Sequence, residues 1–339
     1  MRSVTILSTS GQIMMNDELT AAGESHGAAQ ACACREMGWV DLWVVGSIGI
    51  DDIATPDATR TDVLGGSVTY ACAAASFFTR VGAVGIVGSD FPDAFLARYR
   101  SFGIDMAGLQ CVPGRTFRWS GVYEADFINR RTLTTELGVF ADFKPKLPVA
   151  FRSAPYVLLG NIGPELQEHV LDQACGARFV VADTMDLWIN VAREALDRVI
   201  KRVDLLMLND GEARLLTGRH NLRDCAAAIL EAGPRYVVIK KGEHGAQLFS
   251  RDGIALIPAY PVNVVVDPTG AGDAFAGGFL GSLARSGRTD EPAIRTALLY
   301  GATVASFGVE AFSLERLEQL APSDIESRLE TLRGMMQIG

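Results

Sequence analysis

The run from Val264 to Leu280, VVVDPTGAGDAFAGGFL, constrains the fold more than any other stretch of this chain. Three valines, a glycine-rich turn, and then small and aromatic residues predict a buried strand that delivers a carboxylate to the start of a helix. Gly270 and Gly272 let the backbone bend, because neither carries a Cβ atom. A helix that begins here directs unpaired N–H groups and the positive end of its dipole into the turn, which predicts an anion site.

Asp273 lies in the first turn of this predicted helix, where a fixed negative charge would repel a bound anion. A base that removes a hydroxyl proton while that oxygen attacks a phosphorus would explain the carboxylate. A packing turn with an aspartate as helix-dipole partner would explain the same residues. The turn alone leaves both interpretations open.

The charge and composition of the chain limit the kinds of molecule that it can bind. The 339 residues carry a net charge of −9, which argues against nucleic acid or an anionic membrane surface, because both require clustered Lys and Arg. With 48% hydrophobic residues, the chain can build one large or two smaller α/β domains. The six cysteines lack CxxC spacing, which indicates neither a disulfide framework nor a zinc site and favours a reducing, cytoplasmic location. They are Cys32, Cys34, Cys72, Cys111, Cys175 and Cys225.

The first 38 residues differ from the rest in being rich in Ala, Ser, Gly and short polar residues. They lack the basic segment and apolar core of a signal peptide, so we expect a poorly ordered extension before a domain over residues 39–335. Translation that starts at Met37 is an alternative, which mass spectrometry of the native N-terminus would test. No apolar run reaches the roughly 18 residues of a membrane span, so no membrane partner is expected.

Apolar strands alternate with helical patterns along most of the chain, which predicts an α/β fold with a mostly parallel central sheet and helices on both faces. Strands are expected at 42–46, 83–87, 156–159, 179–182, 205–208 and 236–239, with a hairpin over 246–257. Helices are expected at 67–80, 91–102, 165–173, 192–199, 211–216, 271–285, 291–306 and 322–332.

The segment from about 108 to 142 has a different character. Residues 116–123 and 132–135 resemble exposed strands rather than buried ones, which predicts a small antiparallel sheet inserted into the α/β body. With residues 52–64, this inserted sheet is expected to act as a lid.

Four separated segments resemble the ribokinase-like, or PfkB, carbohydrate kinases over nearly all of the predicted domain. The run DPTGAGDAFAGGF is similar to the C-terminal signature of that family and differs from it at Pro268. The resemblance implies that Asp273 is the catalytic base. It also implies that the turn over Gly270, Ala271 and Gly272, with the N–H group of Asp273, stabilises the transferring phosphoryl group.

Gly65 and Gly66 resemble the N-terminal signature of the family, in which a glycine pair lies against the substrate. Asp51 matches a family aspartate that binds substrate hydroxyls, and a carboxylate can accept two hydroxyl hydrogen bonds at once. Thr69 and Tyr70 stand where the family usually has an Asn, which argues against ordinary ribokinase activity. Without the resemblance, a solvated loop and a plain helix start would explain the same residues.

Asn209 and Glu212 resemble the Asn-x-x-Glu motif that organises Mg²⁺ and its waters beside the phosphates. By spacing alone they predict a capping box equally well. Similarity also suggests a monovalent cation site, with K⁺ as the candidate, beside Asp267 and Thr269.

Lys240, Gly242 and Gly245 resemble the nucleotide loop of the family, although a basic hairpin turn would account for them as well. The sequence contains no GxxxxGK[ST] motif, and residues 46–51 lack GxGxxG, so neither a Walker-type nor a dinucleotide site is expected. A helix N-terminus is then the predicted holder of phosphate.

The sequence therefore predicts an ATP- and Mg²⁺-dependent kinase that phosphorylates a hydroxyl of a small sugar or polyol. A nucleoside kinase is the first alternative, since aromatic residues of the lid could stack on a base or merely pack the lid. A non-catalytic sensor of a sugar or nucleotide is the second, and a homodimer through the inserted sheet is allowed. The aromatic residues are Phe117, Trp119, Tyr123 and Phe127.

Overall fold

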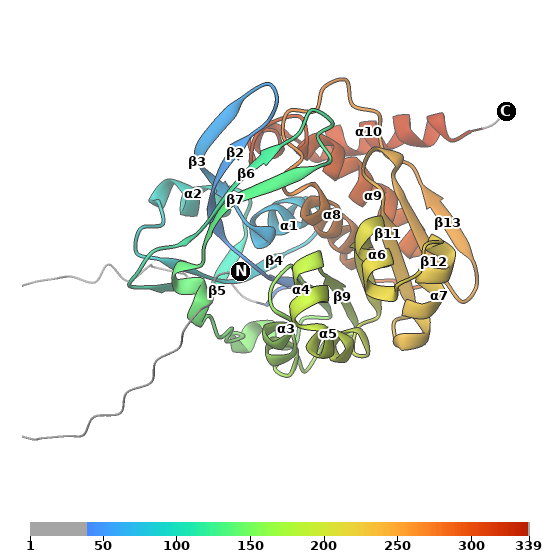
Figure 1. Cartoon of the computed structure of the whole chain (residues 1–339), viewed down its shortest axis with the longest axis horizontal. Helices are drawn as coiled ribbons and strands as arrows, with labels where there is room; N and C mark the ends of the chain where they lie inside the picture. Colours follow the sequence, from blue (N-terminus) through green and yellow to red (C-terminus); the bar gives the residue numbers. More distant parts are fainter. Residues whose placement is uncertain (1–38, 338–339) are drawn as a thin grey trace, which may run out of the picture. The chain divides into compact units, whose positions relative to one another are not determined.

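The computed structural model describes residues 39–337; the predicted N-terminal extension and the alternative start at Met37 lie outside them. Sheet A is nine-stranded, in the order β13-β12-β11-β10-β9-β8-β1-β4-β5 (Figure 1). All neighbours are parallel except β11 with β12 and β12 with β13, which confirms the predicted α/β fold. The strands are β1 (Leu42–Val45), β4 (Val81–Gly88), β5 (Asp105–Val112), β8 (Tyr156–Leu159), β9 (Phe179–Asp183), β10 (Leu205–Asn209), β11 (Tyr236–Lys240), β12 (Ala246–Ser250) and β13 (Ile254–Ile257).

Helices cover both faces of sheet A. Every residue of β1 is buried, as expected for a strand whose alternate side chains meet a packed layer on either side. Trp43 and Val45 share a core with the helices of one face, whereas helices of the other face pack on β1 from the opposite side. The first set is α3 (Pro164–Leu171), α5 (Arg193–Ile200), α6 (Asp210–Thr217) and α7 (Leu222–Ala232); the second is α1 (Ser67–Ser76), α8 (Ala271–Ser286) and α9 (Glu291–Gly308).

Three further helices lie beside these layers, namely α2 (Asp93–Ser101) next to β5, α4 (Asp186–Val191) next to α5 and α6, and α10 (Pro322–Met335) on α9. No helix within residues 39–337 is both long enough and apolar enough to cross a bilayer.

A second, four-stranded sheet B forms the predicted inserted sheet, in the order β3-β2-β6-β7. Its strands are β2 (Gly49–Ala54), β3 (Thr59–Gly65), β6 (Phe117–Tyr123) and β7 (Arg130–Glu136). The predicted antiparallel pairing holds for β6 with β7 and for β2 with β3, whereas β2 and β6 run parallel. The segment was also expected to begin near residue 108, but β5 continues to Val112 as the edge strand of sheet A.

Sheet B turns one face toward the body of the domain. Ile53 and Tyr123 of that face form a small apolar cluster with Phe312, and Trp119 packs against it. Asp51 lies on the same face because it is two residues from Ile53 along β2. Sheet B thus presents Asp51 and Trp119 toward the C-terminal half of the chain.

The three valines at 264–266 do not form the predicted strand. Val264 is 61% exposed, and residues 261–268 have no strand neighbour. The N–H groups of Val266 and Asp267 both donate to the carbonyl oxygen of Val309, just after α9, at 2.8 and 3.3 Å. A loop-to-loop contact therefore holds this segment, and its apolar residues pack without entering a sheet.

Helices α1 and α8 lie at very short range, which fixes the position of the α8 N-terminus. A Cβ atom on Gly277 would lie 2.1 Å from the carbonyl oxygen of Ala71, and one on Gly281 would lie 2.8 Å from the Cα of Ala75. The small residues of both helices are what allow their backbones to approach this closely.

We expect Gly277→Ala to lower the free energy of unfolding by about 1–3 kcal/mol, the usual range for an overpacked interior site. The added methyl group meets backbone, which cannot rotate aside, although alanine is favoured over glycine in helices by roughly 1 kcal/mol. Gly334→Ala in α10 is the matched control, because nothing lies within 4 Å of its added Cβ. Denaturant titrations that show both variants stabilised alike would contradict the close α1–α8 contact.

Candidate active site

The turn at Gly270 begins α8. Gly270 has φ +75°, and a Cβ there would lie 2.3 Å from the ring of Tyr70, so both conformation and space require glycine. The predicted anion site included the N–H group of Ala271, but that group donates to the carbonyl oxygen of Pro268 at 3.2 Å. The N–H groups of Gly272 and Asp273 stand in the part of a helix that has no intrahelical acceptor. Because the Asp273 carboxylate accepts from the N–H group of its own residue, the N–H group of Gly272 is the donor that the turn offers to an anion.

Asp273 is half-buried in the first turn of α8. Burial is the largest cause that raises its pKa to about 7, and the nearby carboxylate of Asp183 raises it further, while Lys240 and Arg130 act in the opposite direction. Within residues 39–337 no ion pair holds its side chain. A carboxylate with a pKa near neutrality can accept a proton from an alcohol and release it afterwards.

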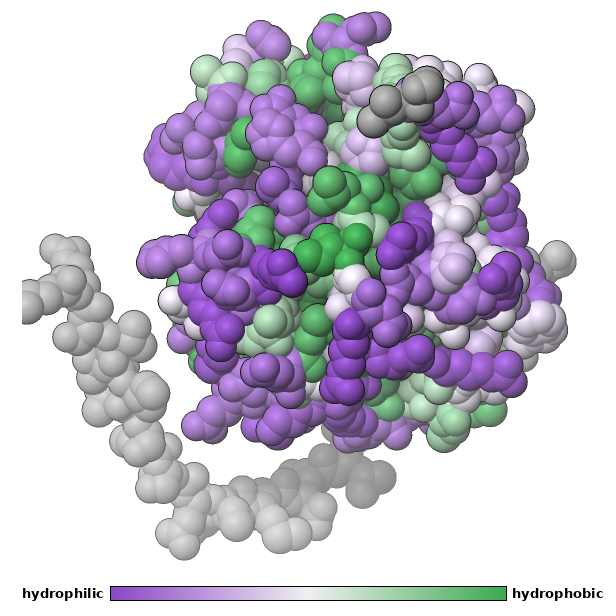
Figure 2. All heavy atoms as spheres, turned by 90° about the vertical axis from the view of Figure 1, so that its right-hand side faces the viewer, coloured by the Kyte–Doolittle hydropathy of each residue, from purple (hydrophilic) through white to green (hydrophobic). Residues whose placement is uncertain are grey.

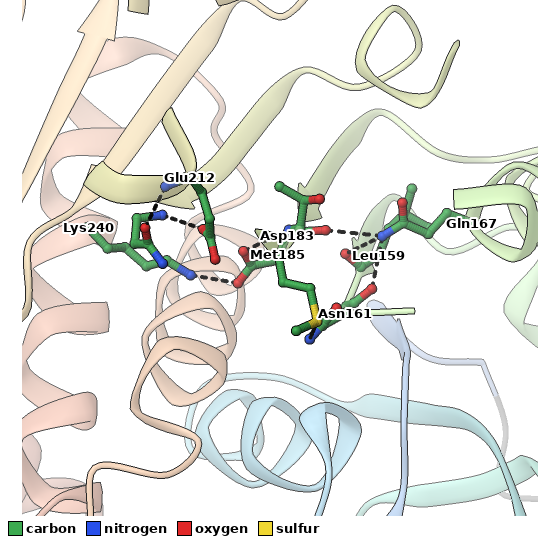
Figure 3. A network of polar contacts seen from close by, with 10 residues as sticks. Leu159, Asn161, Gln167, Asp183, Met185, Glu212 and Lys240 are labelled. Atoms are coloured by element: carbon green, nitrogen blue, oxygen red, sulfur yellow. Dashed lines mark hydrogen bonds and ion pairs between the residues drawn. The ribbon is translucent and has the colours of Figure 1, made fainter. Parts of the chain in front are cut away.

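A buried ion pair lies beside this carboxylate. Figure 3 shows Lys240, at the end of β11, pointing to Asp183 at the end of β9, with Nζ and Oδ2 2.6 Å apart. A Cβ on Gly272 would lie 3.2 Å from the same Nζ, so the ammonium group also borders the α8 turn. Lys240 thus supplies a positive charge where the predicted phosphate site meets the edge of sheet A.

Gln167 of α3 holds the strand ends that position Asp183. Its side-chain amide donates to the carbonyl oxygens of Gly160 and Asp183, at 2.9 and 3.1 Å, and is 1% exposed (Figure 3). The carboxyl ends of neighbouring parallel strands are where ligands bind in open α/β sheets. The buried amide therefore ties β8 to β9 at the functional edge of the sheet.

Asn209 and Glu212 form the capping box that their spacing predicts. The Asn209 side chain accepts from the N–H of Glu212 at 2.8 Å, and the Glu212 carboxylate accepts from the N–H of Asn209 at 2.7 Å (Figure 3). Burial raises the pKa of Glu212 to about 7, and Asp183 raises it as well, against the lowering effect of Lys240. A carboxylate that is costly to ionise next to other carboxylates fits a nearby cation.

No group of three or more His, Cys, Asp or Glu side chains in residues 39–337 is arranged to enclose a metal ion. Mg²⁺ beside a nucleotide usually keeps several waters and is held by one or two side chains together with phosphate oxygens. Such an ion needs no enclosing group of side chains. Asn209 and Glu212 fit that mode.

A cavity of about 450 Å³ opens beside the α8 turn and brings predicted residues together. Lys240, Gly242 and Gly245 line it together with Ala271 and Gly272, whereas the other predicted site residues do not. Figure 2 views the side of the molecule that carries β12 and β13 and shows apolar residues gathered at the centre of that face. A cavity with apolar walls and one end at a helix N-terminus suits a ligand with a flat ring and an anionic tail.

The tip of the β6–β7 hairpin also reaches this cavity. Asp126, Phe127 and Ile128 are among the lining residues. The Asp126 carboxylate shapes the turn by accepting from the N–H groups of Ile128 and Asn129, both at 2.9 Å, and Phe127 has φ +55°. Phe127 therefore belongs to this cavity, while Tyr123 is buried and its hydroxyl bonds to Thr269.

The predicted acceptor residues meet on the other side of the turn. Asp51 is 4% exposed, and a Cβ on Gly65 would lie 1.9 Å from its Oδ2 atom. Gly66 has φ +97° and would place a Cβ 2.5 Å from the carbonyl oxygen of Ser47. Position 65 thus requires glycine because the Asp51 carboxylate fills the space beside it, and position 66 requires glycine because of its φ angle and the nearby backbone of Ser47.

The Asp51 carboxylate is unusually hard to ionise. Burial raises its pKa to about 8, and the carboxylates of Asp267, Asp52 and Asp273 add to the shift. Its Oδ1 atom is sealed from solvent and has no hydrogen-bond partner within the described chain. Such a group marks a site that a polar ligand would complete.

Asp267 and Thr269, the predicted monovalent cation residues, form a local turn. The Oδ1 atom of Asp267 accepts from the N–H of Thr269 at 2.9 Å, and its Oδ2 atom is sealed and unpartnered among residues 39–337. Burial raises the pKa of Asp267. An unpartnered oxygen is compatible with a bound cation, and the monovalent cation site stays a prediction.

Sequence reasoning missed two charged residues of the site. Asp183 pairs with Lys240, and its only signal was its position at a strand end. Arg130, on β7, acts on both Asp51 and Asp273, since it lowers the pKa of each. Nothing in the local sequence distinguishes Arg130 from Arg131, because the pleat of a strand, known only from the structure, decides which one faces the site.

Comparison with known proteins finds kinases of small molecules among its relatives. The chain is 33% identical over 266 residues to the cytidine kinase of Thermococcus kodakarensis, an alignment that covers 76% of this chain and 94% of the relative. The nucleoside kinase of Burkholderia thailandensis in complex with inosine has a TM-score of 0.71 at 22% identity, with 86% and 97% of the two chains covered. An E. coli protein in complex with ATP and Mg²⁺ has a TM-score of 0.72 at 20% identity, over 86% and 99%.

The model of the pfkB family of carbohydrate kinases matches residues 41–315, which include both sheets and the α8 turn. The expected membership in this family is therefore confirmed. This chain belongs to the pfkB family and is a sugar or nucleoside kinase, a phosphotransferase whose acceptor is a hydroxyl group.

Proposed function

We propose that this protein transfers the γ-phosphate of ATP to a hydroxyl group of a ribonucleoside. The relative named cytidine kinase, which is matched over almost its whole length, and the structural neighbour that binds inosine support a nucleoside acceptor. A small sugar or polyol, the acceptor expected from the sequence, is the second candidate, because the family is one of carbohydrate kinases.

One observation carries the nucleoside proposal: sheet B places an aromatic ring next to the predicted hydroxyl-binding carboxylate. Asp51 of β2 and Trp119 of β6 are direct partners in the parallel register and share one face of the sheet. The indole lies along Gly121, and its N–H donates to Thr132 Oγ1 at 3.2 Å, which fixes the ring. A fixed indole offers a stacking surface for a base, while the carboxylate accepts hydrogen bonds from ribose hydroxyls.

In the proposed reaction, the nucleotide occupies the cavity that ends at the α8 turn, with its phosphates beside Lys240 and the N–H group of Gly272. Asn209 and Glu212 would hold Mg²⁺, through water, and the bound ion supplies charge neutralisation to the phosphates. Asp273 takes the proton of the acceptor hydroxyl as the oxygen of that hydroxyl bonds to the γ-phosphorus of ATP, and ADP leaves as the bond from this phosphorus to the bridging oxygen breaks. Positioning and electrostatic stabilisation carry most of the barrier reduction in phosphoryl transfer, so these few side chains suffice.

Two further parts of the proposal concern ions and assembly. A monovalent cation at Asp267 and Thr269 would be coordinated by the unpartnered Oδ2 atom of Asp267. Turnover that depends on K⁺ concentration would support this cation site. Strand β7 is exposed along its whole length at the edge of sheet B, which supports a homodimer through this sheet. Sedimentation of the purified chain tests the homodimer.

The acceptor is tested by ADP formation across cytidine, uridine, adenosine, inosine, ribose, fructose and an inositol, each with ATP and Mg²⁺. We expect one ribonucleoside to exceed every free sugar in kcat/KM by at least about tenfold, because one fixed contact to the base contributes on the order of 1–2 kcal/mol. A free sugar as the best acceptor would favour the second candidate. ADP formation with none of them would favour a binding protein that no longer catalyses.

A further inference from the structure

Three oxygen atoms around the α8 turn are buried and have no hydrogen-bond partner among residues 39–337. They are Asp51 Oδ1, Asp267 Oδ2 and the hydroxyl of Tyr70. Two of them belong to predicted site residues, but no role has been given to Tyr70. A buried hydroxyl without a partner costs on the order of 1–3 kcal/mol, so a stable fold keeps one where something binds it.

Tyr70 lies between the two halves of the site. It is 3% exposed in α1, four residues after Gly66, and the face of its ring fills the space beside Gly270. The hydroxyl of Thr69, its neighbour, donates to the carbonyl oxygen of Gly65 at 2.6 Å, which holds α1 against the glycine that contacts Asp51. Tyr70 is thus packed against the anion turn and anchored beside the acceptor carboxylate.

The unpartnered state of Tyr70 is unusual in its own surroundings. The hydroxyl of buried Tyr99 pairs with Thr69 at 2.7 Å, and the hydroxyl of buried Tyr123 pairs with Thr269 at 3.1 Å. Burial, followed by the charges of Asp51 and Asp267, raises the pKa of the Tyr70 phenol above its ordinary value. The phenol therefore keeps its proton and remains a hydrogen-bond donor.

We infer that Tyr70 is a specificity-determining residue: its hydroxyl and Asp51 Oδ1 together bind one hydroxyl group of the acceptor substrate. An alcohol matches this pair because its oxygen accepts from the phenol while its own proton is donated to the carboxylate. A metal cation would leave the phenol proton without an acceptor. Both protein atoms are sealed from solvent, so the acceptor reaches them only when the surrounding structure opens.

The inference rests on the proposed function only in that it needs an acceptor with several hydroxyls, whether nucleoside or sugar. It predicts which analogues are rejected. An acceptor that lacks the bound hydroxyl leaves a buried donor and a buried acceptor unpaired, and such sites discriminate strongly.

The test compares the wild type with Tyr70→Phe, which removes the hydroxyl and keeps the ring against Gly270. The acceptor is whichever of the panel the wild type phosphorylates best, together with its two singly deoxygenated forms, such as the 2′-deoxy and 3′-deoxy nucleosides. We expect Tyr70→Phe to lower kcat/KM for the full acceptor by about 10- to 100-fold, mainly through KM, with KM for ATP unchanged. One deoxy form should be poor for the wild type yet nearly equal to the full acceptor for the variant.

Tyr99→Phe is the matched control, since it removes another buried hydroxyl beside α1 that is bonded within the protein. We expect it to lower thermal stability and leave the preference for the full acceptor intact. Tyr70→Phe without ligand should be at least as stable as the wild type, because its hydroxyl makes no bond to lose. Unchanged discrimination between full and deoxy acceptors in Tyr70→Phe would overturn the inference, as would equal destabilisation by the two variants. A sugar as best acceptor would contradict the nucleoside proposal alone.

Discussion

Replacement of Asp273 by Asn is expected to lower kcat by at least about 10²-fold, the usual contribution of a general base. The amide keeps the size of the carboxylate in the first turn of α8 but cannot take a proton from the acceptor hydroxyl. Steady-state turnover with saturating ATP and acceptor measures the loss. Asp290→Asn is the matched control, because Asp290 also begins a helix and its side chain accepts from the N–H of Ala293; this variant should retain turnover within about twofold, since Asn caps as well as Asp.

The pH profile separates loss of the base from loss of the fold. With a pKa of about 7, Asp273 of the wild type becomes a base as pH rises, so kcat/KM should fall about tenfold per pH unit below 7. The pKa of Asp273 is higher in the folded than in the unfolded chain, so the free energy of unfolding falls as pH rises from about 4 to above 7 and the group ionises. Asp273→Asn escapes that cost and should be at least as stable as the wild type at pH 8. Normal turnover of a folded variant would remove Asp273 from the chemistry.

Replacement of Lys240 by Met is expected to lower the free energy of unfolding by about 3–5 kcal/mol at pH 8, because it leaves a buried carboxylate without its partner. The side chains of Lys240 and Asp183 are 18% and 8% exposed. The Lys240 charge also lowers the pKa of Glu212 and of Asp273. The substitution therefore removes a favourable positive charge from Asp183, Glu212 and Asp273 together. Urea titration measures the loss, which should shrink toward pH 5, where Glu212 and Asp273 become neutral.

A double variant shows whether the pair itself is responsible. Asp183→Asn together with Lys240→Met removes both charges and should recover part of the stability that Lys240→Met alone loses. Asp197→Asn breaks the exposed pair with Arg193 and should change stability by no more than about 1 kcal/mol. Equal losses in the single and double variants would indicate that Lys240 stabilises the fold through packing of its aliphatic stem instead.

The sequence was most informative where local rules decide the structure. Apolar runs found the strands of sheet A except β5, and Gly270, whose φ of +75° favours glycine, marked the start of α8. Asn209 and Glu212 were foreseen as a capping box, and the box forms. Helix α7 was missed, although Asn221 caps it and Leu222, Cys225, Ala226 and Ile229 recur at helical spacing.

What the sequence could not supply was long-range geometry. Three valines before Asp267 have strand propensity, yet the hydrogen bonds to Val309 depend on a segment over 40 residues away. The same holds for Arg130 and Tyr70, whose importance comes from which face of an element meets the site. The parallel pairing of β2 with β6, which sets Trp119 beside Asp51, likewise depends on tertiary packing.

The β6–β7 hairpin has a thermodynamic consequence. Its strand β6 carries Trp119 beside Asp51, the proposed hydroxyl-binding carboxylate, while its tip, at Phe127 and Ile128, borders the proposed nucleotide cavity. If both ligands order this hairpin, its conformational entropy is lost once for the two of them, so the ligand that binds first would lower the entropic cost of binding the second. Such linkage is reciprocal: the nucleotide must tighten the acceptor by the same factor by which the acceptor tightens the nucleotide.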